Sequence, residues 1–491
     1  MSALRRAFTQ GSLYTLFQGL GMAVSLISFP ILTRILSVEE YGNLALFNAT
    51  VAILLSVAKC GITTSFIRSY AGVEKADDER RRQLYSSAIG TSVALGLGIA
   101  IVYTIVIFFL GDYFGRTLTA VLLFAGLPIL IGDLRDLFFA FFRAQEKVLA
   151  LSVVGLVMRV GSVTTGILAC VLLLGGLTGY IVGVIAFEAA LVLLLGLYFA
   201  RRGLFSLRLV SPSVAGQLLV FGAPLLLFEL SSLVNDNADR FLINHFLGSA
   251  QVGIYSVGYN FAMYVQGMIT APLWMTIFPI YTKIWETDGP AKTSEFLNVV
   301  LNYYLALAIL IIVGVSVTSR ELITLLATDK FAAAASITPF VIISVMLYGT
   351  THITAAGFYL AKRTKTIAVL TLSCALINIL INLALIPSYG ILGAAYATMA
   401  SYFILTVLVT AFSRDLLRVR WPLGSLAIYV GAAVVSAFLA IHVEHSSLFA
   451  SLVLKSCVVT ASYVLIVLSL DRRLRETAAR VGTGLYRKLR A

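Results

Sequence analysis

Residues 28–47 read SFPILTRILSVEEYGNLALF, two apolar stretches joined by the short polar turn SVEEYG. They belong to apolar segments at about 11–36 and 42–68, each long enough to cross a hydrocarbon core of roughly 30 Å. Similar segments fall at about 85–110, 117–142, 148–173, 179–200, 217–247, 252–282, 297–318, 335–360, 367–386, 391–412, 423–441 and 448–470. The sequence therefore predicts an all-α polytopic membrane protein with about 14 transmembrane helices.

The composition supports lipid, rather than water, as the surrounding solvent. The 491 residues are 59% hydrophobic and only 12% charged, whereas soluble domains are about 25% charged. The net charge of +13 comes from basic residues in short loops on one side, so we expect no nucleic-acid partner. The four cysteines stand in separate apolar segments, and no P-loop motif occurs. We therefore expect no metal, no cofactor, no ATP-driven motor and no enzymatic activity.

The positions of lysine and arginine indicate the orientation. With the N-terminus inside, the inside segments hold roughly 26 of the 36 basic residues, and the outside loops hold about three. Cytoplasmic loops carry such an excess in membrane proteins generally. The sequence therefore predicts a multi-pass protein of the inner (plasma) membrane with both termini in the cytoplasm.

A weak internal repeat divides the chain. LSVEEYGNLALFNA at 36–49 aligns with LGSAQVGIYSVGYN at 247–260, and two further pairs of stretches match in the same order. Six spans per repeat is an even number, so the repeats share one orientation in the membrane. We expect two pseudo-symmetric six-helix lobes, an N-lobe at 1–210 and a C-lobe at 211–415, followed at 416–491 by two extra spans and a basic tail.

The motif at 28–47, with its short turn and the Tyr-Gly that opens the second span, resembles bacterial polysaccharide transporters. These are the O-antigen-type, lipid-linked oligosaccharide flippases of the multidrug/oligosaccharidyl-lipid/polysaccharide export superfamily. The resemblance implies alternating access around a central cavity lined by spans one, two, seven and eight. It implies a cargo of undecaprenyl-diphosphate-linked sugar units, moved from the cytoplasmic to the outer leaflet. Polysaccharide polymerases and assembly proteins are the protein partners that we expect for such a pathway.

Span seven carries the densest polar stripe. Glu229, Asp236 and Arg240 are spaced so that they share one helical face, and Asp239 lies beside it. One interpretation is a water-filled path in which Asp236, Glu229 or Asp239 couples transport to H+ or Na+ and Arg240 contacts the cargo. The other is a structural ion pair between Asp236 and Arg240.

Cations on spans one and two are the candidates for an anionic cargo. Lys59 lies deep in span two, and no acid on spans one or two is at its depth. An unpaired buried ammonium suits a diphosphate, as do the guanidinium groups of Arg68 and Arg34. Alternatively, Arg68 snorkels to the cytoplasmic surface, and Arg34 bonds Glu39 or Glu40 in the outer turn.

Span eight presents an amphipathic stripe that includes Tyr255, Tyr259, Gln266 and Trp274. Such residues on a cavity wall can stack on sugar rings and hydrogen-bond to their hydroxyls. Equally, Tyr255 and Trp274 fit an interfacial aromatic belt, and stripes of this kind often serve packing. Both interpretations stay open at this point.

Asp133 and Arg159 are predicted to form a structural ion pair. Each lies about a dozen residues from the turn between spans four and five, so antiparallel helices bring them to the same depth. Arg135 and Asp136 are assigned to the same network.

The favoured function is therefore a non-enzymatic flippase for a lipid-linked oligosaccharide. A multidrug extruder of organic cations is the alternative within the same fold, but it would have an acid-dominated cavity and about twelve spans. A non-transporting scaffold or a glycan polymerase is the alternative from another class. A polymerase of this pathway would need a large outer loop carrying arginines, and the outer loops here are short.

Reporter fusions test the topology. We expect fusions after Asp78, Phe205 and Leu417 to report the cytoplasm and one after His445 to report the outside, because the basic loops stay inside. Protease cleavage of the tail after Asp471 from the outside would contradict the fourteen-span arrangement.

Overall fold

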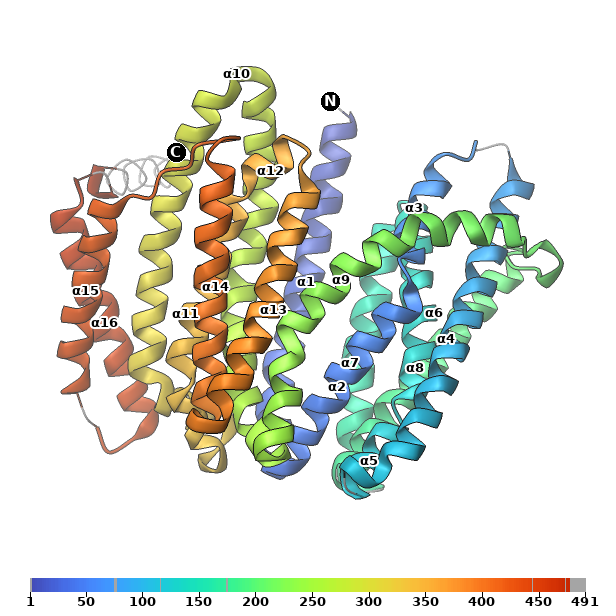
Figure 1. The fold of residues 1–491 in the computed structure, drawn as a ribbon, viewed down its shortest axis with the longest axis horizontal. Helices are drawn as coiled ribbons and strands as arrows, with labels where there is room; N and C mark the ends of the chain where they lie inside the picture. The colour runs from blue at the N-terminus through green and yellow to red at the C-terminus, as the bar shows by residue number, and fades with distance from the viewer. Residues whose placement is uncertain are drawn as a thin grey trace, which may run out of the picture. The chain divides into compact units, whose positions relative to one another are not determined.

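The computed structural model is all-helical where it describes the chain (Figure 1). It describes residues 2–74, 77–114, 116–173, 175–443, 445–472 and 474–476. Within these ranges 12 helices are long and apolar enough to cross a membrane. One of them, 249–327, runs for 79 residues and contains Gly289 with non-helical backbone angles, so it includes two of the predicted spans. The all-helical membrane fold is confirmed, and the count of fourteen is approximate.

The chain separates into two compact units, Met1–Gly253 and Ile254–Ala491. The first contains α1 (Ser2–Ile35), α2 (Val38–Lys59), α3 (Ile62–Ala71), α4 (Asp78–Phe114), α5 (Arg116–Leu123), α6 (Gly126–Ala144), α7 (Val148–Leu172), α8 (Gly176–Arg201) and α9 (Pro212–Leu247). The second contains α10 (Ser249–Ala327) from Ile254 onward, α11 (Thr338–Thr354), α12 (Ala356–Leu360), α13 (Thr364–Tyr389), α14 (Ile391–Ser413), α15 (Leu423–Ile441) and α16 (Leu448–Leu470). The division into lobes that the repeat suggests stays a prediction.

The turn after α1 caps the next helix. The Ser37 side chain accepts a hydrogen bond from the backbone N–H of Glu40, whose carboxylate accepts one from the Ser37 N–H at 2.8 Å. The other oxygen of Glu40 accepts the backbone N–H of Leu177 at the start of α8, at 3.1 Å. The short polar turn therefore ends one helix, starts α2 and ties it to α8.

The second predicted span is broken in its interior. Cys60 and Gly61 both adopt left-handed backbone angles, with φ of 41° and 68°, between the end of α2 and the start of α3. Gly222 of α9 lies against this break so closely that a Cβ on either glycine would overlap the backbone of the other segment. The break places Lys59 in the last turn of α2, where a cation interacts favourably with the helix dipole.

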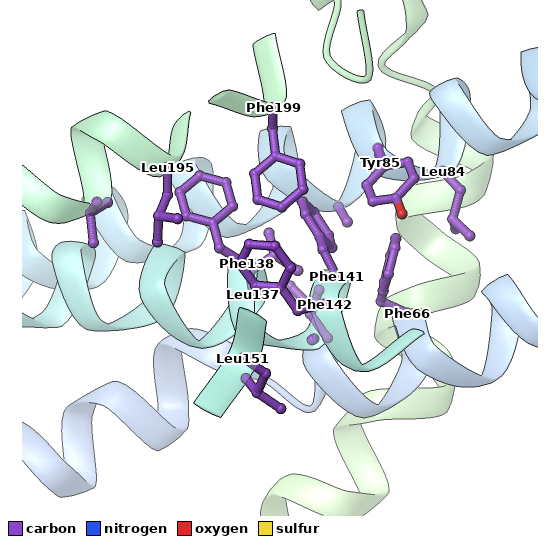
Figure 2. Packing of buried hydrophobic residues seen from close by; sticks show 14 of the residues in the cluster. Phe66, Leu84, Tyr85, Leu137, Phe138, Phe141, Phe142, Leu151, Leu195 and Phe199 are labelled. Atoms are coloured by element: carbon purple, nitrogen blue, oxygen red, sulfur yellow. The ribbon is translucent and has the colours of Figure 1, made fainter. Parts of the chain in front are cut away.

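An aromatic core holds the helices around this break in place. Phe66 of α3, Tyr85 of α4 and Phe141 of α6 are each at most 1% exposed, and their ring centroids lie 4.5–5.1 Å apart (Figure 2). Phe199 of α8 lies 5.3 Å from Phe141. Lipid tails are as apolar as these side chains, so close packing rather than exclusion from water holds such helices together. The core thereby fixes α6 relative to α3, α4 and α8.

Because α9 approaches the break closely at Gly222, we expect alanine to destabilise the protein at Gly222 but not at Gly216. Gly222→Ala should lower the free energy of unfolding by about 1–3 kcal/mol, because the new methyl group meets backbone that must shift. Gly216→Ala in the same helix should be neutral or slightly stabilising, since nothing lies within 4 Å of that position. Thermal unfolding of both purified variants is the measurement, and equal stability would contradict the close contact.

Candidate functional site

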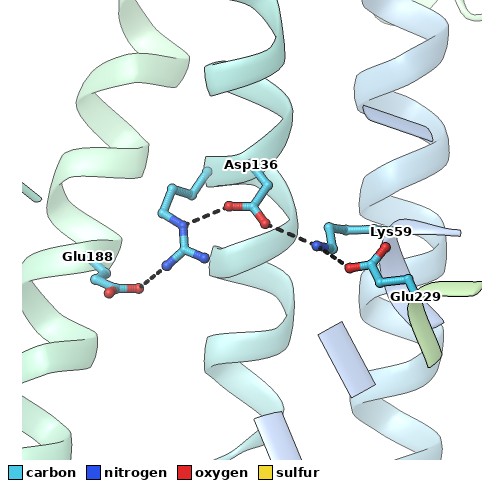
Figure 3. Close-up of polar contacts among 5 residues, drawn as sticks. Lys59, Asp136, Glu188 and Glu229 are labelled. Carbon is cyan, nitrogen blue, oxygen red and sulfur yellow. Dashed lines mark hydrogen bonds and ion pairs between the residues drawn. The ribbon is translucent and has the colours of Figure 1, made fainter. Parts of the chain in front are cut away.

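Lys59 lies between two carboxylates that come from different helices. Its Nζ is 3.0 Å from Oε1 of Glu229 on α9 and 3.4 Å from Oδ2 of Asp136 on α6 (Figure 3). The Lys59 side chain is 17% exposed and that of Glu229 is 41% exposed. One ammonium thus links three helices, and of its two partners Glu229 is the more exposed, at 41% against 26% for Asp136.

The contacts continue beyond Asp136 as a chain of alternating charge. Arg135 donates through Nε to Asp136 Oδ1 at 3.0 Å and through Nη1 to Oε2 of Glu188 on α8 at 3.2 Å (Figure 3). The sequence Glu188–Arg135–Asp136–Lys59–Glu229 therefore crosses α8, α6, α2 and α9. Three acids face two bases in this chain, so the fully ionised chain carries one excess negative charge.

A cavity of about 200 Å³ lies between α2, α6 and α8. Arg135 and Glu188 stand on its wall together with Asn48 and Tyr180, and most of its other lining residues are apolar. Polar groups in an apolar cavity are the usual composition of a small ligand site. This end of the charged chain is therefore next to open space inside the helical bundle.

The prediction that Lys59 is unpaired is wrong. Spans one and two hold no acid at its depth, but α6 and α9 each supply one. Glu229 was recognised as part of the polar stripe of span seven, but its partner was not. Glu188 was missed, and its only signal was a single acid within the apolar run of α8.

The predicted ion pair between Asp133 and Arg159 is also wrong. Arg159 donates to the Ser25 hydroxyl at 2.5 Å, which ties α7 to α1. Asp133 is fully buried, and neither of its carboxylate oxygens accepts a hydrogen bond from the residues that the structure describes. Asp133 faces α4, because a Cβ at Gly96 would lie 3.6 Å from its Oδ2. Arg159 thus contacts α1 while Asp133 faces α4, so the two side chains do not pair.

The other candidate cations of the first two spans lie at more exposed positions. Arg68 is exposed, and its guanidinium lies over the ring of Phe221 at 4.1 Å from the centroid. Arg34 is exposed and donates to the backbone carbonyl of Pro30 at 2.9 Å. Their role toward a cargo stays a proposal.

Arg240 forms several contacts within its own helix. It is 7% exposed, and it donates to the backbone carbonyl of Asp236 at 2.6 Å and to the side chain of Asn237 at 3.3 Å. Its Nη1 lies 3.6 Å from Oδ1 of Asp239, which is 2% exposed. These contacts connect neighbouring turns of α9, and ion coupling at Asp236 or Asp239 stays a proposal.

Span eight begins with packed rather than open aromatic residues. Tyr255 and Tyr259 are 0% and 2% exposed, their ring centroids lie 5.7 Å apart, and Gln266 is buried as well. This burial favours the packing interpretation for the first part of the stripe in this conformation.

Further along α10, partly exposed aromatic residues gather in the second unit. Trp274 has His352 of α11 at 5.1 Å, Phe278 at 5.1 Å and Tyr359 of α12 at 5.6 Å between ring centroids. Tyr281 is buried beneath them, and its centroid lies 6.3 Å from that of Trp274. We call Trp274, Phe278, Tyr281, His352 and Tyr359 the aromatic cluster.

The fold and the charged chain define a multi-pass helical membrane protein with ionised groups inside its bundle. Residues 31–336 match the family described as polysaccharide biosynthesis protein, and the chain belongs to this family. It is 25% identical over 337 residues to the lipopolysaccharide biosynthesis protein WzxC of Escherichia coli (strain K12), covering 63% of this chain and 61% of that protein. It is 25% identical over 247 residues to the probable flippase AglR of Haloferax volcanii, covering 48% and 51%. The chain thus spans less than two thirds of either relative.

Solved structures share the fold. The inward closed conformation of the lipid II flippase MurJ superposes with a TM-score of 0.76 at 14% identity, covering 94% of this chain and 99% of that one. An inward-facing multidrug resistance MATE family transporter of the MOP superfamily superposes with a TM-score of 0.66 at 13% identity, covering 80% and 94%. At these identities the likeness concerns the fold alone.

The contacts of Lys59 predict that the stability effects of substituting Lys59 and Glu229 are not additive. Lys59→Met leaves Glu229 and Asp136 without their shared cation and should cost about 2 kcal/mol of unfolding free energy. This is less than the roughly 3–5 kcal/mol for a fully buried pair, because the Glu229 side chain is only partly buried. Adding Glu229→Gln should restore about half of the loss.

Thermal unfolding and membrane abundance measure this cycle. Lys292→Met breaks an exposed pair with Asp288 and should change neither quantity. If Lys59→Met were as stable as the unmodified protein, the three-helix contact would not contribute to the fold.

Proposed function

We propose that the chain is a flippase that moves a lipid-linked oligosaccharide from the cytoplasmic to the outer leaflet by alternating access. The observation that carries the proposal is the family match over residues 31–336, together with a charged chain inside the spans. The names of two relatives, the lipopolysaccharide biosynthesis protein WzxC and the probable flippase AglR, also support the proposal. We propose undecaprenyl diphosphate as the lipid carrier, the inner membrane as the location and cytoplasmic termini.

The charged chain offers a way to hold a diphosphate without a permanently bare cation. In this conformation Lys59 is neutralised by Glu229 and Asp136. A diphosphate brings several anionic oxygens that can replace Glu229 at the ammonium. Glu229 is the partner that can leave at low cost, because its side chain is 41% exposed. We therefore propose that cargo and Glu229 compete for Lys59.

The sugar moiety requires a different surface. The aromatic cluster presents ring faces on which pyranose rings can stack, while His352 and Tyr359 can form hydrogen bonds with sugar hydroxyls. We propose it as the sugar contact in the second unit. Arg34, Arg68, Arg240, Tyr255, Tyr259 and Gln266 remain secondary candidates for cargo contacts.

One observation favours a second function, the extrusion of organic cations. The chain from Glu188 to Glu229 contains three acids and two bases, and an acid-rich site attracts cations. The fold is also that of a MATE family transporter. The family match favours the flippase. The excess of acids over bases in the charged chain makes the extruder the alternative to be tested.

A reconstitution assay separates the two functions. The full chain in liposomes should accelerate the leaflet exchange of a fluorescent polyprenyl-diphosphate saccharide and leave ethidium distribution unchanged. The variant Lys59→Met/Glu229→Gln should lower the lipid rate about tenfold relative to Glu229→Gln alone, since only the anion-binding ammonium differs between them. Both variants lack the carboxylate of Glu229, so a difference between them reports on Lys59.

Two controls complete the assay. Lys59→Arg in the Glu229→Gln background should keep part of the activity, because it preserves the charge but not the compact ammonium. Lys292→Gln in the exposed pair with Asp288 should keep all of it. Ethidium transport without lipid transport in the unmodified protein would replace the flippase by the extruder.

A further inference from the structure

Asp133 is a buried carboxyl group that does not belong to the charged chain from Glu188 to Glu229. It is 0% exposed in the interior of α6, and neither oxygen accepts a hydrogen bond within the described part of the chain. Ser92 of α4, also 0% exposed, is near enough across the helix contact to interact with this carboxyl group, but the two groups do not have the geometry of a regular hydrogen bond. Gly96 of α4 gives the carboxyl group its space.

An ionised Asp133 would be costly in this position. Removing a carboxylate from water costs several kcal/mol unless a cation or hydrogen bonds compensate it. Lys59, the cation whose charge acts on Asp133, is already shared by Asp136 and Glu229 at 3.4 and 3.0 Å. The charged chain from Glu188 to Glu229 already carries one excess negative charge. Ionising Asp133 beside it would raise this excess to two.

The charged groups around α6 supply no further compensation. The stretch of α4 that faces Asp133 has no charged residue between Tyr85 and Phe109. The charged residues on the other helices that pack against α6 are Glu39, Glu40 and Lys59 of α2, Arg68 of α3, Arg159 of α7, and Glu188 and Arg201 of α8. Glu39 and Glu40 stand in the first turn of α2, and Arg201 is exposed in the last turn of α8. Arg68 lies over Phe221, Arg159 bonds Ser25 and Glu188 bonds Arg135.

We propose that Asp133 is a proton-binding site that is occupied in this conformation and is controlled by the pairing of Lys59 with Glu229. When Glu229 withdraws, the charged chain keeps two acids and two bases and becomes neutral. The free-energy cost of ionising Asp133 then falls. The carboxyl O–H bond then breaks, the proton leaves to water and the carboxylate remains beside Lys59. Movement of α9 is thereby coupled to the binding and release of one proton at α6.

Protonation of Asp133 does not depend on the proposed flippase function. Only the role of this proton in transport rests on that function. Infrared difference spectra of the purified full chain, recorded during a pH titration in potassium salt, report protonated carboxyl groups directly. We expect a carboxyl band at neutral pH that is lost in Asp133→Asn and retained in Asp288→Asn, which changes an exposed carboxylate. An identical band in Asp133→Asn and the unmodified protein would overturn the proposal.

A second variant leaves Asp133 intact and tests the coupling. In Glu229→Gln the band should disappear at a pH about one unit lower than in the unmodified protein, because one neighbouring negative charge is gone. An unchanged titration would overturn the coupling. Exchanging potassium for sodium at constant pH should leave the band unchanged, and its loss in sodium would replace the proton by a metal cation.

Transport assays show whether the site serves the flippase. In proteoliposomes, Asp133→Asn should abolish the stimulation of lipid-saccharide movement by a pH gradient while leaving exchange without a gradient within about twofold. If the unmodified protein moved no lipid-saccharide, the proposed function would fail while the infrared result would still stand. Gradient stimulation that persisted in Asp133→Asn would remove the proton site from the transport cycle.

Discussion

The ammonium of Lys59 is the group on which the arrangement of the first unit depends. It needs two carboxylates, 3.0 and 3.4 Å away, and these can reach it only if α2, α6 and α9 bring their charges to one depth. The break at Cys60 and Gly61 makes this possible, because it ends α2 directly after Lys59 and lets α9 approach at Gly222. The aromatic core between α3, α4, α6 and α8 then holds α6 so that Asp136 faces the ammonium.

The energetics of such a contact differ from those of a salt bridge in a soluble protein. In the bilayer an unpaired charge costs about 2.5–3.5 kcal/mol even on insertion scales, so the partners of Lys59 prevent a loss more than they add stability. The stability of the bundle comes from packing, as in the rings of Phe66, Tyr85 and Phe141. A charged chain that adds little stability is then better explained by a role in binding a charged ligand than by its contribution to the fold.

The sequence was sufficient to predict the spans, the all-helical fold and the family resemblance, because all three follow from local patterns of hydropathy and a short turn. It was also sufficient to recognise Glu229 as part of a polar face. It could not predict that Glu229 pairs with Lys59, 170 positions away, since pairing depends on how each helix is rotated about its axis. Asp133 illustrates the same limit, because its place in the sequence did not indicate that its carboxyl group faces α4 rather than Arg159.

The second unit contains an ion pair that clarifies what is special about the first. Lys455 of α16 contacts Glu321 of α10 at 2.6 Å, and the Ser451 hydroxyl also donates to that carboxylate. One acid faces one base there, both are largely buried, and separating them would leave two uncompensated charges, so this pair can act only as a brace. The chain around Lys59 has more acids than bases, and one acid is half-exposed. Its partners can therefore be exchanged without leaving the ammonium bare, which is the physical requirement for a site that binds and releases a charged ligand.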